Sequence, residues 1–201
     1  MSGAVLKHAA AVALLTLAVP AHAAMYVSER EGAMTLTGFF ERGDELRFAE
    51  LLARPRTTKL KVVYLDSFGG AVVPGILIGR MIRKAGLATA VDARSARCDS
   101  ACTLVFAGGV RRHYVAGESV FEGDSGRSGL GFHPAHTRDP AWTRAELSDK
   151  ATAWMIAHYR QMGAPQAAEL MRRAGFSNIF RPSGATALRV RIATTLAAPA
   201  H

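Results

Sequence analysis

Strand-like and helix-like patterns of hydrophobic and polar residues alternate along the first half of the chain. Residues 34–39 alternate and are rich in β-formers, which predicts a strand. Residues 61–65 form a nearly continuous apolar run, typical of a strand buried on both faces. Between them, Asp44 is placed to cap a helix. The spacing of the apolar residues that follow predicts a helix face made of Leu46, Ala49, Leu52 and Ala53.

The next segments repeat this order. The second strand ends at Gly69-Gly70, and an apolar stripe at helical spacing follows and stops at Gly86. The stripe consists of Pro74, Leu77, Ile78, Met81, Ile82 and Ala85. Residues 87–91 predict a strand, and the apolar residues 101–107 predict a helix. The order of strand, glycine turn, helix, strand, turn and helix predicts an α/β fold with a mainly parallel sheet and flanking helices.

The second half is less regular. We expect short strands at 114–115 and 119–121, a glycine-rich loop over 123–131 and a helix over 145–162. The spacing predicts that one side of this helix carries Leu147, Ala151, Trp154, Met155, His158 and Met162. His158 on that side is interpreted as a packed core residue. The tail from Ile179 is weakly patterned, and no repeat or low-complexity linker divides residues 24–201, so we expect one domain there.

The first 23 residues follow a different pattern. A basic start that includes Lys7 precedes the apolar run 9–19, and Ala21-His22-Ala23 fits a small-x-small cleavage site. The run is well short of the ~20 residues that a membrane span needs. We therefore expect a signal peptide over 1–23, a periplasmic or secreted mature protein and no stable membrane span after cleavage, with an uncleaved anchor as the alternative.

Charge and composition narrow the function. The chain of 201 residues carries a net charge of +9, but its arginines are scattered and no basic run is interleaved with aromatic residues. We expect a solvated basic surface that favours anionic partners and does not bind nucleic acid. No histidine pair has a metal-ligand spacing with cysteine or carboxylate, so neither a metal nor a cofactor is expected.

The two strand-to-helix turns supply the candidate chemistry. In a parallel sheet both turns lie at the carboxyl edge, where such proteins bind ligands. The backbone N–H groups of Gly69-Gly70 precede a helix and are suited to an oxyanion, although the pair also fits a plain tight turn. Ser100 stands where the second helix begins, so it is either an ordinary N-cap or a nucleophile that a base can reach.

His133 is the base that we select. It follows a flexible glycine segment and precedes Pro134, which puts it on a loop, and His136 is the close competitor. His133 lies 33 residues beyond Ser100, so their pairing requires the loop 122–130 to fold back.

Together these motifs resemble the Clp-protease/crotonase superfamily. The resemblance rests on Leu65 to Gly70 leading into a proline-containing helix, on Ser100 opening a helix that runs to Gly109, and on His133-Pro134. It covers residues 34–195 and is strongest to exported Clp-protease-like proteins that share a Cys-x-Ser-Ala-Cys segment. The resemblance implies a Clp-protease/crotonase-like fold of repeated strand-strand-helix units and self-association into a homo-oligomer.

The resemblance also implies roles for single residues. Ser100 is then the nucleophile, His133 the general base, and Gly69, Gly70 and Ala101 the oxyanion hole. Asn178 stands where the family has an acid, so it can orient His133 but cannot stabilise the imidazolium with a charge. The implied protein is an ATP-independent serine hydrolase acting on a peptide or protein. The alternatives are a catalytically weak or inactive binding and assembly module and, less favoured for an exported chain, an acyl-CoA enzyme.

Cys98 and Cys102 are the only cysteines of the chain. Residues four apart on a regular helix have Cβ atoms about 5–6 Å apart, and a disulfide needs roughly 3.5–4.5 Å. A disulfide therefore requires Cys98 to precede the helix and the chain to turn sharply at Asp99-Ser100. Our hypothesis is that an oxidised pair clamps the turn that presents Ser100; two reduced, packed thiols are the alternative.

Overall fold

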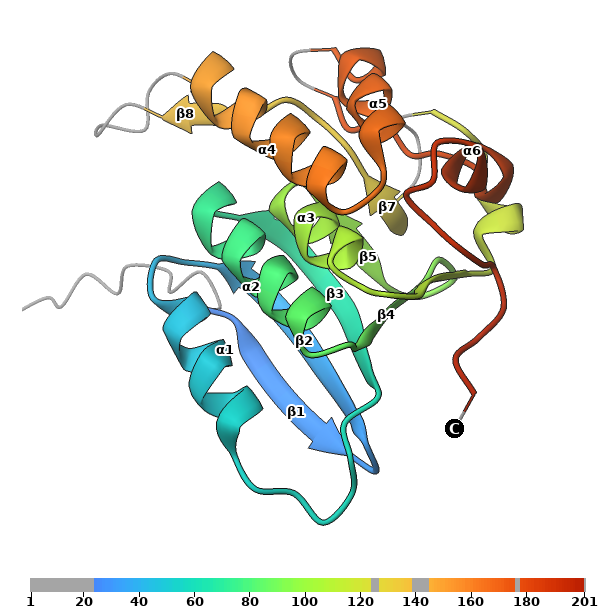
Figure 1. The fold of residues 1–201 in the computed structure, drawn as a ribbon. Helices are drawn as coiled ribbons and strands as arrows, with labels where there is room; N and C mark the ends of the chain where they lie inside the picture. The colour runs from blue at the N-terminus through green and yellow to red at the C-terminus, as the bar shows by residue number, and fades with distance from the viewer. Residues whose placement is uncertain (1–23, 124–126, 139–144, 176–177, 201) are drawn as a thin grey trace, which may run out of the picture.

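The chain folds around a mixed sheet in a computed structural model that describes residues 24–123, 127–138, 145–175 and 178–200 (Figure 1). Within these residues the main sheet has seven strands: β1 (Tyr26–Arg30), β2 (Ala33–Phe40), β3 (Val62–Gly70), β4 (Ala88–Asp92), β5 (Arg97–Asp99), β6 (Arg112–Val115) and β7 (Gly129–Gly131). A second sheet pairs β8 (His136–Arg138) with β9 (Ala145–Leu147).

The helices alternate with the strands in the first half and follow them in the second. They are α1 (Asp44–Ala53), α2 (Val72–Lys84), α3 (Ala101–Ala107), α4 (Asp149–Gln161), α5 (Ala168–Arg173) and α6 (Gly184–Arg189), with 3-10 turns η1 (Gly117–Ser119) and η2 (Pro165–Ala167). In Figure 1, α1, α2 and α3 lie on the same side of the strands β1 to β4.

The main sheet divides at β3. One path runs in the order β1-β2-β3-β4-β6, where β1 is antiparallel to β2 and the other neighbours are parallel. The first half of β3 pairs with β4, whereas its end pairs with β5 through Ser67 and Cys98, and β5 then pairs with β7. The predicted α/β fold with a mainly parallel sheet is confirmed, and the division brings the ends of β3, β5 and β7 together.

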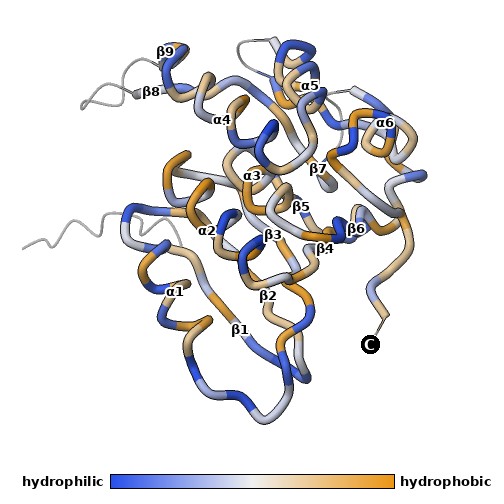
Figure 2. Tube along the Cα trace, in the orientation of Figure 1, coloured by the Kyte–Doolittle hydropathy of each residue, from blue (hydrophilic) through white to orange (hydrophobic). Residues whose placement is uncertain are grey.

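Burial along β3 shows which face of the sheet the helices cover. Val63, Leu65 and Ser67 are fully buried, whereas Asp66 and Phe68 are exposed. The other face is thus less covered than the apolar run predicts. In Figure 2 hydrophobic and hydrophilic residues alternate along α1 and α4, as on helices with one buried face.

Helix α3 is the centre of the core, with all seven of its residues buried. Gly75 and Gly79 of α2 pack directly against it: a Cβ on Gly75 would lie 2.8 Å from the Ala101 carbonyl oxygen, and one on Gly79 would lie 2.5 Å from that of Leu104. The predicted stripe on α2 is confirmed at Pro74, Ile78 and Ile82, which are buried.

The predicted face of α1 is wrong. Leu46 is 67% exposed, and the buried residues of this helix are Asp44, Phe48 and Leu51. Phe48 supplies the largest apolar surface, so its burial decides how the helix is rotated. Gly43 occupies the N-cap position, and Asp44 is the first helical residue.

Two later predictions are also wrong. Residues 119–121 form no strand: η1 occupies Gly117–Ser119, and Phe121 is 87% exposed. The helix predicted over 145–162 begins only at Asp149, because Ser148 caps it and Ala145–Leu147 pairs as β9 with β8. Local apolar content indicated regular structure here without fixing its type.

The predicted signal peptide, residues 1–23, lies outside the described residues. Across the part that is described, no helix combines the length and the apolar character required to cross a membrane.

Candidate active site

Ser100 lies in a strained turn between β5 and α3. Its backbone angles are φ 54° and ψ −120°, in a region that residues other than glycine rarely adopt. Such a conformation costs about 1–3 kcal/mol and persists only where the surroundings impose it. A sharp strand-to-helix turn of this kind presents a side chain at the edge of a sheet.

The Ser100 side chain does not cap the helix that it precedes. Ser100 occupies the N-cap position of α3, but its hydroxyl accepts no capping hydrogen bond. Its backbone is held instead: Thr103 donates to the Ser100 carbonyl from its amide at 2.9 Å and from Oγ1 at 2.6 Å. The ordinary N-cap interpretation of Ser100 therefore lacks the hydrogen bond on which it depends.

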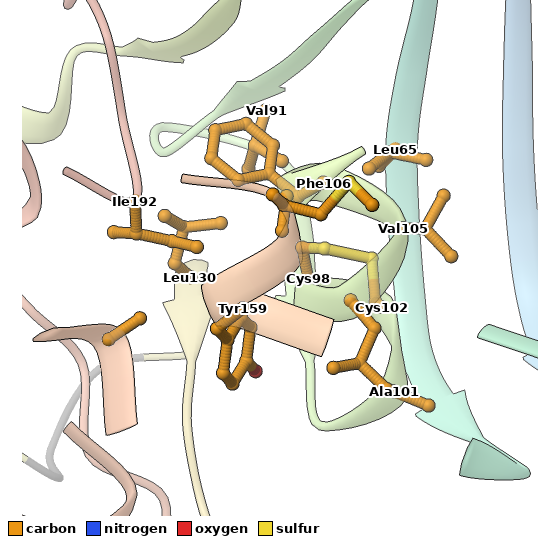
Figure 3. Packing of buried hydrophobic residues seen from close by; sticks show 14 of the residues in the cluster. Leu65, Val91, Cys98, Ala101, Cys102, Val105, Phe106, Leu130, Tyr159 and Ile192 are labelled. Atoms are coloured by element: carbon orange, nitrogen blue, oxygen red, sulfur yellow. A yellow bond between two sulfur atoms is a disulfide. The ribbon is translucent and has the colours of Figure 1, made fainter. Parts of the chain in front are cut away.

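A disulfide brackets this turn. Cys98 in β5 and Cys102 in α3 are bonded, with their Cα atoms 5.0 Å apart (Figure 3). Both residues are fully buried. The predicted pairing is confirmed, and so is the condition that Cys98 precedes the helix and the chain turns sharply at Asp99-Ser100.

The glycine turn at the end of β3 lies against the Ser100 turn. A Cβ placed on Gly69 would lie 2.8 Å from the Cβ of Ser100 and 3.0 Å from the Ala101 nitrogen, so the close approach requires a glycine. The structure thus brings Gly69, Ser100 and Ala101 together. Gly70 faces another neighbour, because a Cβ there would collide with the backbone of Phe40 in β2.

The N–H groups of the glycine turn are not equivalent. The Gly69 amide donates to Ser67 Oγ at 3.1 Å, and Ser67 Oγ in turn donates to the Gly38 carbonyl at 2.6 Å. The Gly69 amide is therefore engaged inside the protein. Gly70 and Ala101 stay the candidates for contacts with an oxyanion.

Strand β7 brings the His133 segment beside Ser100. Asp99 pairs with Gly131 in parallel register, and the Ser100 amide donates to the Gly131 carbonyl at 2.8 Å. His133 follows two residues after Gly131. The chain between Ser100 and His133 therefore folds back as their pairing requires, and the backbones of the two segments run side by side.

The His133 ring is set up as a neutral base. Its Nδ1 lies 2.7 Å from the Pro134 carbonyl oxygen, which can only accept, so Nδ1 carries the proton and Nε2 the lone pair. Burial lowers the pKa of His133 below its usual value, and the neighbouring His136 adds to this effect. The His136 ring stacks on His133 at 5.1 Å between centroids. No hydrogen bond between His133 and Ser100 Oγ is present among the described residues.

Asn178 is exposed in this structure. It lines a pocket together with Gly123, Arg173, Ala174 and Phe180. Its segment runs beside the His133 segment, because Phe132 and Phe180 form an antiparallel bridge. Within the described part of the chain, no hydrogen bond joins Asn178 to His133, and the Nδ1 atom of His133 lies against the Pro134 carbonyl instead. The role of Asn178 stays a prediction.

A buried ion pair lies beneath the site. Arg181 donates from Nη1 to Asp99 Oδ1 at 2.7 Å and from Nη2 to Asp99 Oδ2 at 3.1 Å, and both residues are about 3% exposed. Arg181 Nη1 also donates to the Gly129 carbonyl of β7. The pair thus ties the residue before Ser100 to the strand that leads to His133. Sequence reasoning missed it, because Asp99 resembled one more capping residue and its partner lies 82 residues away.

The other buried histidine serves the core. His158 of α4 is 1% exposed, and its Nε2 lies 2.9 Å from the Leu104 carbonyl oxygen of α3. Burial lowers the pKa of His158 to about 4, so the ring is neutral at pH 7. Its interpretation as a packed residue is confirmed. Across the described residues, no group of three or more His, Cys, Asp or Glu side chains could hold a metal ion.

Comparisons with known proteins identify the fold. No protein-family model matches the sequence, and no curated protein matches it. Among solved structures, the chain is similar to a mutant of the 1510-N membrane-bound stomatin-specific protease, at 13% identity and a TM-score of 0.58 over 82% of this chain and 77% of that chain. This similarity shows that the two chains share a fold, in agreement with the Clp-protease/crotonase-like fold that the motifs predicted.

Two enoyl-CoA hydratases are also among the similar structures. The enoyl-CoA hydratase structure from Streptomyces coelicolor has 16% identity and a TM-score of 0.47 over 95% of this chain and 70% of that chain. The enzyme from Mycobacterium marinum has 12% identity and a TM-score of 0.41 over 87% and 84%.

Proposed function

We propose that the chain is an exported, ATP-independent serine hydrolase that acts on peptides or proteins by acyl transfer. The observation that carries this proposal is the strained, uncapped Ser100 in contact with the Gly69 turn. Strain at a polar residue that is flanked by a disulfide and by a close glycine contact is typical of a functional position.

The reaction follows from the roles proposed for these residues. His133 Nε2 takes the proton of Ser100 Oγ as the oxygen attacks the substrate carbonyl, and the N–H groups of Gly70 and Ala101 stabilise the resulting oxyanion. The protonated His133 then gives its proton to the leaving amine. Water, activated by the same ring, hydrolyses the acyl-enzyme and restores Ser100.

The environment of His133 supports a base that works without an acid partner. The Pro134 carbonyl fixes the ring tautomer and leaves Nε2 as the basic atom. A carbonyl does not stabilise the imidazolium with a full charge as a carboxylate does. We therefore expect a slow enzyme, in which Asn178 contributes by orienting His133 when substrate is bound.

A second function is favoured by the absence of a hydrogen bond between Ser100 and His133 among the described residues. On this alternative the chain is a binding or assembly module on the same fold. Hydrolysis of p-nitrophenyl acetate, which tests acyl transfer without requiring the right peptide, separates the two. The enzyme predicts turnover that Ser100→Ala and His133→Gln abolish and that the exposed control Ser119→Ala retains. Equal rates for all four proteins would support the module.

A further inference from the structure

Helix α4 contacts both halves of the candidate site. The hydroxyl of Thr103 in α3 donates to the Ser100 carbonyl at 2.6 Å and lies 2.6 Å from the hydroxyl of Tyr159 in α4. Thr103 has one hydroxyl proton, and the Ser100 carbonyl accepts it, so Tyr159 is the donor in the second bond. Tyr159 and Thr103 are both fully buried, and Figure 3 shows the Tyr159 ring beside the start of α3.

The other end of α4 holds the segment that carries His133. The Ala135 amide donates to Thr152 Oγ1 at 3.0 Å, and the Ser148 amide donates to the Ala135 carbonyl at 2.8 Å. Ala135 lies two residues after His133. Thr152 and Tyr159 are seven residues apart on one helix, which is about 10 Å along its axis.

We infer that α4 positions the nucleophile and the base relative to each other. Tyr159 holds the Ser100 carbonyl through Thr103, and Thr152 holds the His133 segment through Ala135. The inference rests on the proposed function, because it gives these residues a role only if Ser100 and His133 react. Tyr159, Thr103 and Thr152 are positioning residues and do not touch the substrate.

The hydrogen bonds that link Tyr159 through Thr103 to Ser100 have a specific effect on the Ser100 backbone. A carbonyl that accepts from both the amide and the hydroxyl of Thr103 is fixed in direction. The carbonyl direction sets ψ of Ser100 and thereby the orientation of the next amide, that of Ala101. Because Tyr159 fixes the rotamer of the Thr103 hydroxyl, these two hydrogen bonds restrain both Ser100 and the Ala101 amide, a proposed oxyanion donor.

Removal of single hydroxyl groups tests this role. The rate of Ser100 labelling by a fluorophosphonate probe is measured for wild type, Thr103→Val, Thr103→Ser, Tyr159→Phe and Thr152→Val. We expect Thr103→Val to lower the rate about 10- to 100-fold, since small misplacements of reacting groups have effects of this size. Thr103→Ser should restore it, and Tyr159→Phe and Thr152→Val should each lower it less than Thr103→Val.

Thr89→Val is the matched control. Thr89 is also fully buried, and its hydroxyl donates to a carbonyl at the other end of α3, that of Phe106, at 2.7 Å. Its loss should lower the melting temperature comparably and leave the labelling rate unchanged. A folded Thr103→Val that is labelled at the wild-type rate would overturn the inference. If that variant does not fold, a wild-type rate for Tyr159→Phe would overturn it.

A structural measurement separates this inference from the proposed function. Crystals of Thr103→Val or Tyr159→Phe should show the Ser100 backbone relaxed from its φ of 54°. An unchanged Ser100 turn in both variants would refute the inference even where the wild type is an active enzyme. If no probe labels the wild type but the turn relaxes in the variants, the proposed function is refuted. Helix α4 then positions the Ser100 turn without serving a reaction, so its role in catalysis is overturned as well.

Discussion

The Cα of Gly69 faces the side chain of Ser100 so closely that a Cβ on Gly69 would lie 2.8 Å from the Cβ of Ser100. Real Cβ atoms do not approach to this distance, so the strand end and the serine turn fit together only because position 69 has no side chain. The two turns singled out in the sequence are therefore one structural unit. Any change at Gly69 should act on Ser100 directly.

Gly69→Ala should displace the serine turn and lower both stability and Ser100 labelling. Gly43→Ala is the matched control, because Gly43 has φ of 99° against 94° for Gly69, yet nothing lies within 4 Å of a Cβ there. Both variants carry the conformational penalty of about 1–2 kcal/mol for a side chain in this region. Only Gly69→Ala should also lower the rate of Ser100 labelling, measured as the ratio of its labelling rate to that of Gly43→Ala. Equal labelling of the two variants would contradict the contact.

Arg181→Met should be strongly destabilising. It leaves the Asp99 carboxylate buried without its bidentate partner, which typically costs about 3–5 kcal/mol of unfolding free energy in urea titrations. Arg94→Met, which removes an exposed partner of Asp92, should have a much smaller effect. The double variant Asp99→Asn/Arg181→Met should regain part of the loss. If Arg181→Met were as stable as Arg94→Met, the ion pair would not hold the β5–β7 edge together.

The rate of Ser100 labelling should depend on pH through His133. The base must be neutral, and burial lowers the pKa of His133, so the neutral form persists to lower pH than for an ordinary imidazole. The rate should be flat at and above pH 7 and fall with acid, with its midpoint below about 6.5. His133→Gln should show a low rate without this transition. A midpoint above 7 would mean that a different group is the base.

The Cys98–Cys102 disulfide should affect the serine turn more than global stability. Its loop is so short that the entropic gain is small beside the ~3 kcal/mol of a 15-residue loop. Reduction, or the double variant Cys98→Ala/Cys102→Ala, should therefore lower the melting temperature slightly and the labelling rate severalfold. Intact mass should rise by two hydrogens on reduction. Two free thiols in protein purified without reductant would contradict the clamp.

The sequence predicted the features of the fold that depend on local pattern. The stripe of α2 and the strands around it follow from periodicity. The sharp turn at Ser100 was predicted on the condition that the two cysteines form a disulfide, and the structure contains that disulfide. The rotation of α1 could not be predicted this way, because Leu46 and Phe48 compete for burial and only packing against the sheet decides between them. Regular structure at 145–147 was likewise assigned to a helix, because three residues are too few for their periodicity to separate a strand from the start of a helix; they pair as β9 with β8.

The segments of the candidate site could be selected from the sequence, whereas the contacts between them could not. Ser100, Gly69 and His133 lie in short, recognisable motifs. The contact between Asp99 and Arg181 spans 82 residues. The hydrogen bonds that link Tyr159 to Ser100 pass through a third residue, Thr103. No local pattern reports such pairs. Nor does a motif show that the Gly69 amide is already bound by Ser67 or that Pro134 holds the Nδ1 atom of His133.

The most direct test of the proposed serine hydrolase is the position of the covalent adduct. The protein is treated with a fluorophosphonate at neutral pH and digested, and the modified peptide is sequenced by mass spectrometry. We expect one adduct on Ser100 that is absent in Ser100→Ala, strongly reduced in His133→Gln and unaffected in Ser119→Ala. A wild-type protein that stays unmodified, or an adduct that persists in Ser100→Ala, would contradict the proposed serine hydrolase.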